Sequence, residues 1–495
     1  MNTLETAENP EKLRRIAIDP VSRVEGHGKV TLLLDEDNRV RQVRLHIVEF
    51  RGFEKFIQGR PYWEVPVMVQ RLCGICPVSH HLAASKAMDM LLGMEKLTPA
   101  ADKNRRLMHY GQILQSHALH FFHLCSPDLL FGFDSEVAKR NIVGIAAAFP
   151  EVAKKGVLLR KYGQEIIRMT AGKKIHGTGS IPGGVNKSLS KEERKALLGE
   201  IYTMVSWSLE AVGIVKQLFE SNREFFENFG RFDAKSLSLV RADGAMDLYH
   251  GDLRAREIDG KKIFDHFDYR HYWDVISEDV KPWSYMKFPY LGSLGPDEGW
   301  YRVGPLARIS NCDFIPTPLA DRERREFLEY DDGRAAGATL GYHWARMIEM
   351  LHAAENIKDL LHDDEIEGED LIARQGERAG RGVGVIEAPR GTLIHHYRVN
   401  EEDLVIRANL IVSTTHNNQA MNEAIRQVAL QYLDGREITE GLLNHIEVAI
   451  RAFDPCLSCA THALGRMPLE IELFDCEGEK LSSASRSSEG IFLAQ

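Results

Sequence analysis

Two Cys-x-x-Cys pairs lie near opposite ends of this 495-residue chain. The first pair is Cys73 and Cys76, and the second is Cys456 and Cys459. Four cysteine thiolates are a ligand set that zinc and other soft metals prefer. Structural zinc sites usually close short loops, whereas a metal held by these pairs would connect the two ends of a large domain. The pattern therefore predicts a fold whose two ends meet, with a structural zinc site as one interpretation.

Composition and charge narrow the class of protein. Seven cysteines are too few, and odd in number, for a disulfide framework, so we expect thiols in a reducing compartment. The net charge of −10 argues against a nucleic acid as the main partner, because phosphate binding needs a basic surface. The acidic N-terminus does not resemble a signal peptide, and no apolar run approaches the ~18 residues of a membrane helix. We therefore expect no direct membrane span.

The hydrophobic pattern changes along the chain. Apolar and polar residues alternate over about 14–50, which predicts a β-hairpin or short meander, and helical periodicity dominates from about 64 to 454. The clearest helix is 191–228, preceded by a capping box of Ser190 and Glu193. Further helices are expected at 77–93, 99–124, 136–170, 335–362, 418–433 and 439–453, with loops or short strands at 171–187, 290–318 and 376–392. The pattern predicts a predominantly helical α+β fold, with a core bundle of long helices and small peripheral β-sheets.

Two other chemical interpretations are less favoured. A thioredoxin-like redox site is excluded because neither cysteine pair follows a strand within a βαβ pattern. The histidines at 117, 120 and 123 recur every three residues on a predicted helix and could suggest a metal site. Their common face drifts around the helix, so we expect side chains packed in a bundle rather than three ligands of one metal.

The residues around the cysteine pairs carry a resemblance to a known family. The two central segments are Arg71-Leu72-Cys73-Gly74-Ile75-Cys76, continuing to His80, and Asp454-Pro455-Cys456, continuing to Cys459 and His462. The others are Arg23-Val24-Glu25-Gly26-His27, Arg51-Gly52-Phe53-Glu54, Pro182-Gly183-Gly184, Gly304-Pro305-Leu306-Ala307-Arg308, Ala388-Pro389-Arg390-Gly391 and Thr414-Thr415-His416-Asn417. In this order they resemble the large subunit of the nickel-iron hydrogenases over nearly the whole chain. The resemblance implies that family's fold and its reaction, H2 = 2 H+ + 2 e−.

The resemblance also implies a cofactor. Heterolytic cleavage of H2 needs a metal with an open coordination position, a base beside it and a path for electrons. By family analogy, a Ni-Fe(CN)2(CO) centre is held by Cys73 and Cys456 as terminal ligands of nickel. Cys76 and Cys459 would bridge nickel to iron, because thiolates suit such an electron-rich site.

Cyanide ligands buried in protein need hydrogen-bond donors. Arg390, its neighbour Pro389 and Thr414 match the family positions that surround them. Many family members carry an Asp where Ser116 aligns, so Arg390 would depend more on Asp454. The family's usual Pro and Trp are also absent near Thr414, where this chain reads Val412-Ser413-Thr414-Thr415-His416-Asn417.

Proton transfer is assigned by the same resemblance. Cys456 would be the first proton acceptor and Glu25 the first relay, provided that their side chains lie within hydrogen-bond distance. His80 would donate a hydrogen bond to a bridging thiolate. Asp454 would orient the guanidinium of Arg390.

A second metal and a maturation step are implied as well. Mg2+ or another divalent cation would bind Glu54, His462 and the backbone carbonyl of Leu410, beside waters. Residues 463–495 resemble the C-terminal extension that a maturation endopeptidase removes after His462, once nickel chaperones have delivered nickel. The alternating residues Leu469, Ile471 and Leu473 also fit a permanent edge strand. We expect one catalytic domain, residues 1–462, followed by this extension.

The chain is expected to need partner subunits. No G-x-G-x-x-G motif follows a predicted strand, and the cysteines outside the two pairs are too few for an iron-sulfur cluster, so neither NAD nor such a cluster is expected in this chain. Electrons would pass to an iron-sulfur small subunit and on to NAD/FMN diaphorase subunits. The residues around the pairs look most like the cytoplasmic NAD-reducing group. Deazaflavin-reducing and heterodisulfide-linked hydrogenases are alternatives, and the quinone-site subunit of respiratory complex I is a fold relative that lacks the cysteine pairs.

Overall fold

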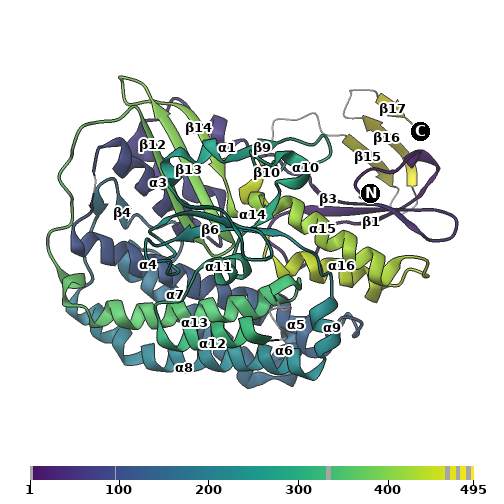
Figure 1. Cartoon of the computed structure of the whole chain (residues 1–495), viewed down its shortest axis with the longest axis horizontal. Helices are drawn as coiled ribbons and strands as arrows, with labels where there is room; N and C mark the ends of the chain where they lie inside the picture. Colours follow the sequence, from purple (N-terminus) through teal and green to yellow (C-terminus); the bar gives the residue numbers. More distant parts are fainter. Residues whose placement is uncertain are drawn as a thin grey trace.

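The computed structural model describes residues 4–94, 96–330 and 336–462, together with three strands between 469 and 494. Long helices lie side by side along one side of the molecule and most of the sheets lie along the other (Figure 1). Strand β1 (Arg14–Ile18) and the last strand, β17 (Phe492–Ala494), lie at the same end. None of the described helices is both long enough and apolar enough to cross a membrane. This arrangement confirms the predicted α+β fold.

Four long helices form the bundle. They are α4 (Pro99–Leu119), α7 (Pro150–Ala171), α8 (Lys191–Ser221) and α13 (Gly341–His362), with α4 against α7 and α13 against both α4 and α8. The shorter helices are α1 (Phe53–Phe56), α2 (Val65–Met68), α3 (Pro77–Leu91), α5 (Ser126–Phe131), α6 (Ile142–Ala148), α9 (Arg223–Asn228), α10 (Gly295–Glu298), α11 (Pro305–Asn311), α12 (Pro318–Glu329), α14 (Ser413–His416), α15 (Asn418–Val428) and α16 (Glu440–Ala452). Two π-helices, His120–Cys125 and Ala429–Leu433, extend α4 and α15.

The predicted helices are present and differ from the observed ones mainly at their ends, but the 12-residue helix α12 was not predicted. The capping box of Ser190 and Glu193 is present, and α8 begins there as predicted. The helix ends at Ser221 because Asn222 has an extended φ of −146°, and α9 continues the segment. A new helix begins at Pro150, which separates α6 from α7. Helix α11 was not predicted, because its seven residues show no long periodicity.

The strands form small sheets. The N-terminal meander of β1, β2 (Gly28–Leu34) and β3 (Val40–Ile47) is antiparallel, as predicted. A second sheet has the order β11 (Tyr301–Arg302), β6 (Lys235–Val240), β7 (Asp252–Arg256), β8 (Lys262–Phe267). The third contains β12 (Arg381–Ala388), β13 (Gly391–Val399) and β14 (Val405–Ile411). The others pair β4 (Ser180–Ile181) with β5 (Gly184–Val185), β9 (Ile276–Asp279) with β10 (Phe288–Leu291), and β15 (Leu469–Phe474) with β16 (Lys480–Arg486) and β17.

The sequence predicts peripheral sheets, but the β12–β14 sheet is mostly buried. Helix α3 packs directly on β12. A Cβ atom on Gly382 or Gly384 would lie 1.9 or 2.0 Å from a carbonyl oxygen of α3, so only glycine permits this contact. These glycines therefore serve close packing, and the packing sets the first cysteine pair, just before α3, against the sheet.

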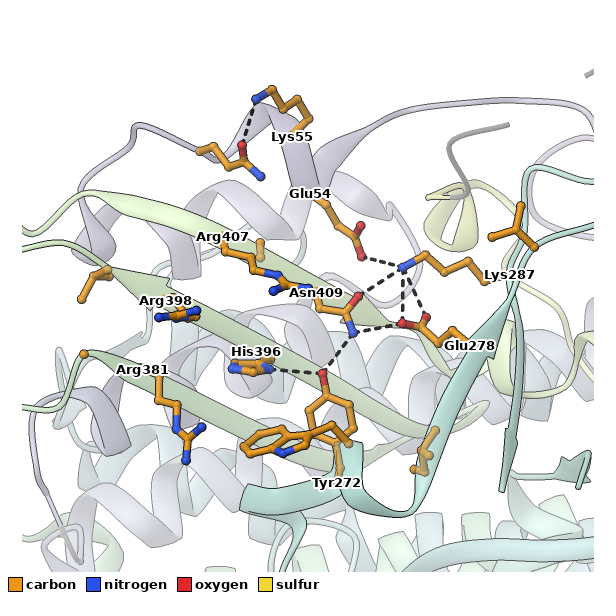
Figure 2. A pocket seen from close by; sticks show the side chains of 17 residues that line it. Glu54, Lys55, Tyr272, Glu278, Lys287, Arg381, His396, Arg398, Arg407 and Asn409 are labelled. Atoms are coloured by element: carbon orange, nitrogen blue, oxygen red, sulfur yellow. Dashed lines mark hydrogen bonds and ion pairs between the residues drawn. The ribbon is translucent and has the colours of Figure 1, made fainter. Parts of the chain in front are cut away.

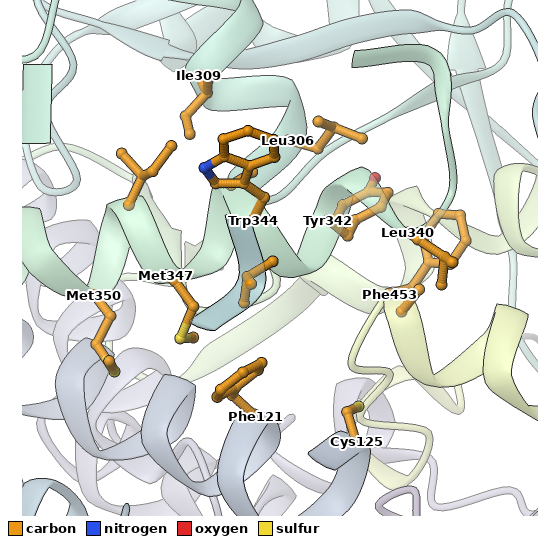
Figure 3. Packing of buried hydrophobic residues seen from close by; sticks show 14 of the residues in the cluster. Phe121, Cys125, Leu306, Ile309, Leu340, Tyr342, Trp344, Met347, Met350 and Phe453 are labelled. Atoms are coloured by element: carbon orange, nitrogen blue, oxygen red, sulfur yellow. The ribbon is translucent and has the colours of Figure 1, made fainter. Parts of the chain in front are cut away.

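One continuous apolar core joins the bundle to the N-terminal sheet, and it includes both Val30 of β2 and Val428 of α15. Trp344 is fully buried in this core, near Leu306 and Ile309 (Figure 3). The rings of Phe219, Phe327 and Tyr330 are each 5.2 Å from its ring. Aromatic side chains contribute large buried areas and specific ring contacts. The four cysteines lie in a second apolar cluster, which α3 shares with the β12–β14 sheet.

Candidate metal centre

The four cysteines of the two pairs converge on one buried point. Their sulfur atoms all lie within 4.8 Å of one another. Cys73 Sγ is 3.2 Å from Cys456 Sγ, Cys76 Sγ is 3.9 Å from Cys459 Sγ, and the two sulfurs of the second pair are 2.8 Å apart. These distances exceed the ~2.05 Å of a disulfide bond, and all four cysteines are free. The two ends of the chain meet, as the sequence predicted, in a set of potential metal ligands.

The first pair is placed by the start of α3. Cys73 follows a 3-10 turn, Val69–Leu72, and Cys76 is the N-cap residue of α3, with Pro77 in the first helical position. The sulfur of Cys73 accepts hydrogen bonds from the N–H groups of Ile75 and Cys76 at 3.2 and 3.1 Å. These two N–H groups hold the sulfur of Cys73 in a fixed position at the start of α3.

The second pair is held by the N-terminal segment. Leu457 N donates to the carbonyl of Glu25 at 2.9 Å, and Cys456 N donates to the hydroxyl of Thr414 at the same distance. Gly26, with φ +83°, faces this loop, and a Cβ there would lie 2.6 Å from Ser458 N. Glycine at this position therefore allows the segment between β1 and β2 to approach the loop closely.

Burial and mutual hydrogen bonds shift the pKa values of these thiols in opposite directions. Hydrogen bonds from the neighbouring cysteines, with His80 adding to them, hold the pKa of Cys76 well below its usual value. Burial raises the pKa of Cys456 and Cys459 well above the usual value. Binding of a cation by all four sulfurs would therefore release protons from the second pair.

Glu25 lies beside the second pair. Its Oε2 is 3.0 Å from Cys456 Sγ and accepts a hydrogen bond from Ser458 N at 3.2 Å. Glu25 and Cys456 also form a parallel bridge. A carboxylate at this distance can exchange a proton with the thiol directly.

Arg390 brings a buried positive charge to the other side of the cluster. Its Nε donates to the carbonyl of Asp454 at 2.6 Å, its Nη2 to Asp454 Oδ1 at 3.0 Å, and its Nη1 lies 3.4 Å from Ser116 Oγ. Burial opposes the charge, but Asp454 and the cysteines raise the pKa of Arg390 well above its usual value. Burial also raises the pKa of Asp454 to about 6, against the opposite effect of Arg390. The structure thus pairs Arg390 with Asp454 and places Ser116 where a second partner would lie.

A narrow cavity adjoins the cluster. Residues from four segments line it: Cys76, Ser79, His80, Ala388, Pro389, Arg390, Leu393, Val412, Ser413, Thr414 and Cys456. It therefore brings together Arg390, Pro389 and Thr414, the three residues that the resemblance places around an iron cofactor.

His80 belongs to a relay of side chains that the sequence analysis missed. Its Nδ1 is 3.1 Å from His395 Nε2, and His395 Nδ1 is 2.6 Å from the hydroxyl of Tyr397. The sequence did contain a signal, because residues 395 and 397 alternate on one face of a strand. Only the packing of α3 on β13 places that face against His80.

Three further residues named by the resemblance lie together near Lys287. Glu54 Oε1 accepts a hydrogen bond from Leu410 N at 2.8 Å and lies 3.4 Å from Lys287 Nζ. Burial raises the pKa of Glu54, although Lys287 lowers it. His462 is buried, which lowers its pKa to about 3, and neither ring nitrogen has a hydrogen-bond partner among the described residues. Buried imidazole nitrogens without a hydrogen-bond partner suit a divalent cation, and Lys287 acts on both His462 and Glu54.

A network of buried ions supports the segment around Arg390. Arg308 pairs with Glu349 and Glu387, and its Nη1 donates to the carbonyl of Ala388 at 3.0 Å. In the sequence, Arg308 lies in one of the family segments but has no predicted role. Its partners come from α13 and β12, so the network depends on tertiary packing.

The histidines on α4 have separate partners, as predicted for packed side chains. His117 pairs with Glu349, and His120 Nε2 is 2.6 Å from the carbonyl of Arg451. His120 also lies near Cys125 and His343, and these three buried side chains form a second group of potential ligands within the described residues. Burial lowers the pKa of His120 and His343, and the guanidinium of Arg346 lowers it further. The same positive charge opposes the binding of a metal cation there.

Known proteins are similar to this chain in sequence and in fold. A family profile described as "Nickel-dependent hydrogenase" matches residues 51–134 and 240–462, and one described as "HoxL-like" matches residues 15–50. The chain is 49% identical to the NAD-reducing hydrogenase HoxS subunit beta of Cupriavidus necator, over 96% of this chain and 100% of that protein. It is 42% identical to one of the subunits of the F420-non-reducing hydrogenase of Methanothermobacter thermautotrophicus, over 94% of this chain and 98% of that protein.

Solved structures agree with these relatives. A crystal structure of an NAD+-reducing [NiFe]-hydrogenase in the H2-reduced state superimposes with a TM-score of 0.89 and 59% identity, covering 91% of this chain and 99% of that one. A Ni-Fe-Se hydrogenase from D. vulgaris Hildenborough, at 24% identity and a TM-score of 0.75, shares the fold.

The fold and the four-thiol site therefore define a metal-dependent redox enzyme. The chain belongs to the nickel-dependent hydrogenases, as the resemblance to their large subunit implied.

Proposed function

We propose that this chain is the catalytic subunit of an NAD+-reducing hydrogenase, and that its four clustered cysteines hold a nickel-iron centre. Cys73 and Cys456 would be terminal ligands of nickel, and Cys76 and Cys459 would bridge to iron. The observation that carries the proposal is the buried cluster of four sulfurs with Glu25 Oε2 at 3.0 Å from Cys456. Soft thiolates in this number suit nickel and low-spin iron. When bound, the centre supplies the open metal position at which H2 reacts.

The residues of the chain would then move the proton. Cys456 would accept it, because this sulfur lies within hydrogen-bond distance of Glu25. Glu25 takes the proton onward across the 3.0 Å contact. His80 contributes to holding the pKa of Cys76 low, which keeps that sulfur a thiolate and a ligand.

Arg390 and Thr414 would surround the cyanide ligands of the iron, with Pro389 excluding water. The buried guanidinium is charged and lines the narrow cavity beside Cys76. Asp454 orients it through two hydrogen bonds. In place of the family's Asp, the hydroxyl of Ser116 is the second partner of Arg390.

A divalent cation, Mg2+ in the first instance, would bind Glu54, His462 and the carbonyl of Leu410. The unpartnered ring nitrogens of His462 support this site. Lys287 lies beside Glu54, so the ammonium would have to move when a cation binds. Metal analysis of a Glu54→Gln variant tests the site, with loss of one magnesium per chain as the expected result.

Electrons would leave through a small subunit with iron-sulfur clusters and reach NAD+ on diaphorase subunits. Exposed apolar side chains in the segment that precedes the first cysteine pair support such a partner: Val48, Phe50, Phe56, Trp63 and Val67, each 37–54% exposed. NAD+ is favoured as acceptor because identity to the NAD-reducing relatives, 49% and 59%, exceeds the 42% to the F420-non-reducing protein. NAD+ as the acceptor favours a cytoplasmic location.

Maturation would require nickel chaperones and an endopeptidase that cuts after His462. The family profile ends at residue 462, which supports the boundary of a catalytic domain at 1–462. Strands β15 to β17 form an antiparallel sheet after that point, and Leu469, Ile471 and Leu473 lie in its first strand as predicted. Residues 463–468 and Cys476 lie outside the described residues.

One experiment separates the nickel-iron centre from a structural zinc site. Nickel, iron and zinc are quantified in the matured protein, and infrared spectra are recorded in the C≡O and C≡N stretching regions. We expect one nickel and one iron per chain together with CO and cyanide bands. Zinc without those bands would contradict the proposal.

A further inference from the structure

A row of three arginines crosses the β12–β14 sheet. Arg381 pairs with Arg398 in the register of β12 and β13, and Arg398 pairs with Arg407 in that of β13 and β14. Cross-strand partners lie on the same face of a sheet, so the three guanidiniums project from one face on adjacent strands. Figure 2 shows these side chains on neighbouring strands of one pocket.

This arrangement is unfavourable without an anion. Like charges directly opposite each other destabilise a sheet. Arg381 lies over the ring of Trp273 at 4.6 Å. None of the three arginines, however, forms an ion pair or side-chain hydrogen bond that could neutralise it with any residue in the described parts of the chain. In contrast, a nearby cation, Lys287, has two carboxylate partners, Glu54 and Glu278.

The row lines a cavity rather than a flat surface. The cavity has a volume of about 1080 Å3, and Lys55 and His396 lie on its wall beside the arginines. Its volume is at the upper end of the usual range for small-molecule sites. The arginines act on His396 in the cavity wall. Burial lowers the pKa of His396 to about 4, and the positive charges of the three arginines lower it further.

The two ends of the cavity differ in charge. Glu54 and Glu278 enclose Lys287 at one end, where Asn409 donates to Glu278 at 3.1 Å and to Tyr272 at 3.0 Å (Figure 2). The other end contains the arginine row and no carboxylate lining residue. An anion would therefore bind at the arginine end and be repelled from the glutamate end.

We propose that the arginine row of β12–β14 binds a small polyanion with at least two linked phosphate groups. Guanidinium groups match phosphate oxygens with two parallel hydrogen bonds each. Adjacent strands lie ~4.8 Å apart, so three arginines span more than one phosphate can contact. The site is separate from the cysteine cluster, and the proposal does not depend on the redox reaction.

The test uses the full-length protein and inorganic pyrophosphate, with binding measured by calorimetry at physiological salt. Arg398→Gln removes the central charge, and Arg436→Gln removes an exposed arginine outside the cavity as the matched control. We expect Arg398→Gln to weaken pyrophosphate binding about tenfold or more, in line with loss of a charged hydrogen bond. Arg436→Gln should leave it unchanged, and orthophosphate should bind at least tenfold more weakly than pyrophosphate.

Thermal unfolding distinguishes a lost site from a damaged fold. Without ligand, Arg398→Gln should unfold at a higher temperature than the unaltered protein, because like-charge repulsion is relieved. Pyrophosphate should raise the unfolding temperature of the unaltered protein and of Arg436→Gln, but not of Arg398→Gln. Equal binding by both variants, or no binding by the unaltered protein, would overturn the proposal. Binding that disappears when partner subunits assemble would also overturn it, because the row would then be covered by an acidic partner surface.

Discussion

The thiol of Cys456 lies 3.0 Å from Oε2 of Glu25, although 431 positions separate the two residues in the chain. The contact depends on Gly26, which lets the N-terminal segment approach the loop of the second pair. It gives the first proton acceptor and the first relay a direct hydrogen bond, so the two can be tested as a unit.

Replacing Glu25 by Gln should lower H2 oxidation at least about 100-fold, because an amide cannot take the proton from Cys456. Nickel and iron contents should stay unchanged, since Gln keeps the size and the acceptor oxygen for Ser458 N. The measurement is H2-dependent dye reduction alongside metal analysis. Glu36→Gln, at an exposed position, is the control. Loss of metal in Glu25→Gln would mean that the residue is structural.

Thr414 can be tested through stability. Thr414→Val removes the hydroxyl that accepts from Cys456 N and leaves a buried donor unsatisfied. The free energy of unfolding of the metal-free chain should fall by about 1–3 kcal/mol in urea titrations. Thr414→Ser keeps the hydroxyl and should lose much less. Equal losses in both variants would assign the effect to packing of the methyl group.

Arg308 should be indispensable for the buried ion network. Arg308→Met leaves Glu349 and Glu387 buried without their cation, which should destabilise the chain by about 3–5 kcal/mol. Arg308 also donates a hydrogen bond to the carbonyl of Ala388, which lines the cavity proposed for the iron ligands. The variant should therefore retain less iron. Unfolding curves and metal analysis measure both effects, with the exposed Arg322→Met as control. Full stability in Arg308→Met would show that the two carboxyls bind protons instead.

We expect the folded protein to lose stability in acid, because the ring of His81 is buried in its neutral form. Its Nδ1 is 2.7 Å from the carbonyl of Pro66 and its Nε2 accepts from Ser180 N at 3.0 Å, so the folded protein requires the neutral ring. Burial lowers the pKa of His81 from 6.5 to about 4. The unfolded chain therefore binds a proton first, and the stability present above pH 6.5 is lost as pH falls toward about 4.

This pH window gives a measurable slope. The shift in the pKa of His81 corresponds to about 3 kcal/mol in the free energy of unfolding. Unfolding free energies measured between pH 7 and pH 4 should depend less on pH in His81→Gln than in the unaltered protein. The exposed His271→Gln should keep the original slope. An unchanged slope in His81→Gln would assign the acid sensitivity to other buried histidines.

Local sequence signals predicted those parts of the fold that depend on neighbours within a few residues. The capping box of Ser190 and Glu193 begins α8, and the alternation over 14–50 forms the meander, because capping and strand alternation act over short distances. The break at Asn222 and the short α11 carried no comparable signal.

The sequence by itself determined the chemistry available to this protein: two cysteine pairs, their flanking motifs and the nickel-dependent hydrogenase family. Tertiary structure alone decided which side chains meet. The relay from His80 to His395 and the ammonium of Lys287 beside Glu54 join segments far apart in the chain. The row of three arginines depends on the register between consecutive strands. No local periodicity encodes such contacts, because they arise from how helices and sheets pack and from the register between strands.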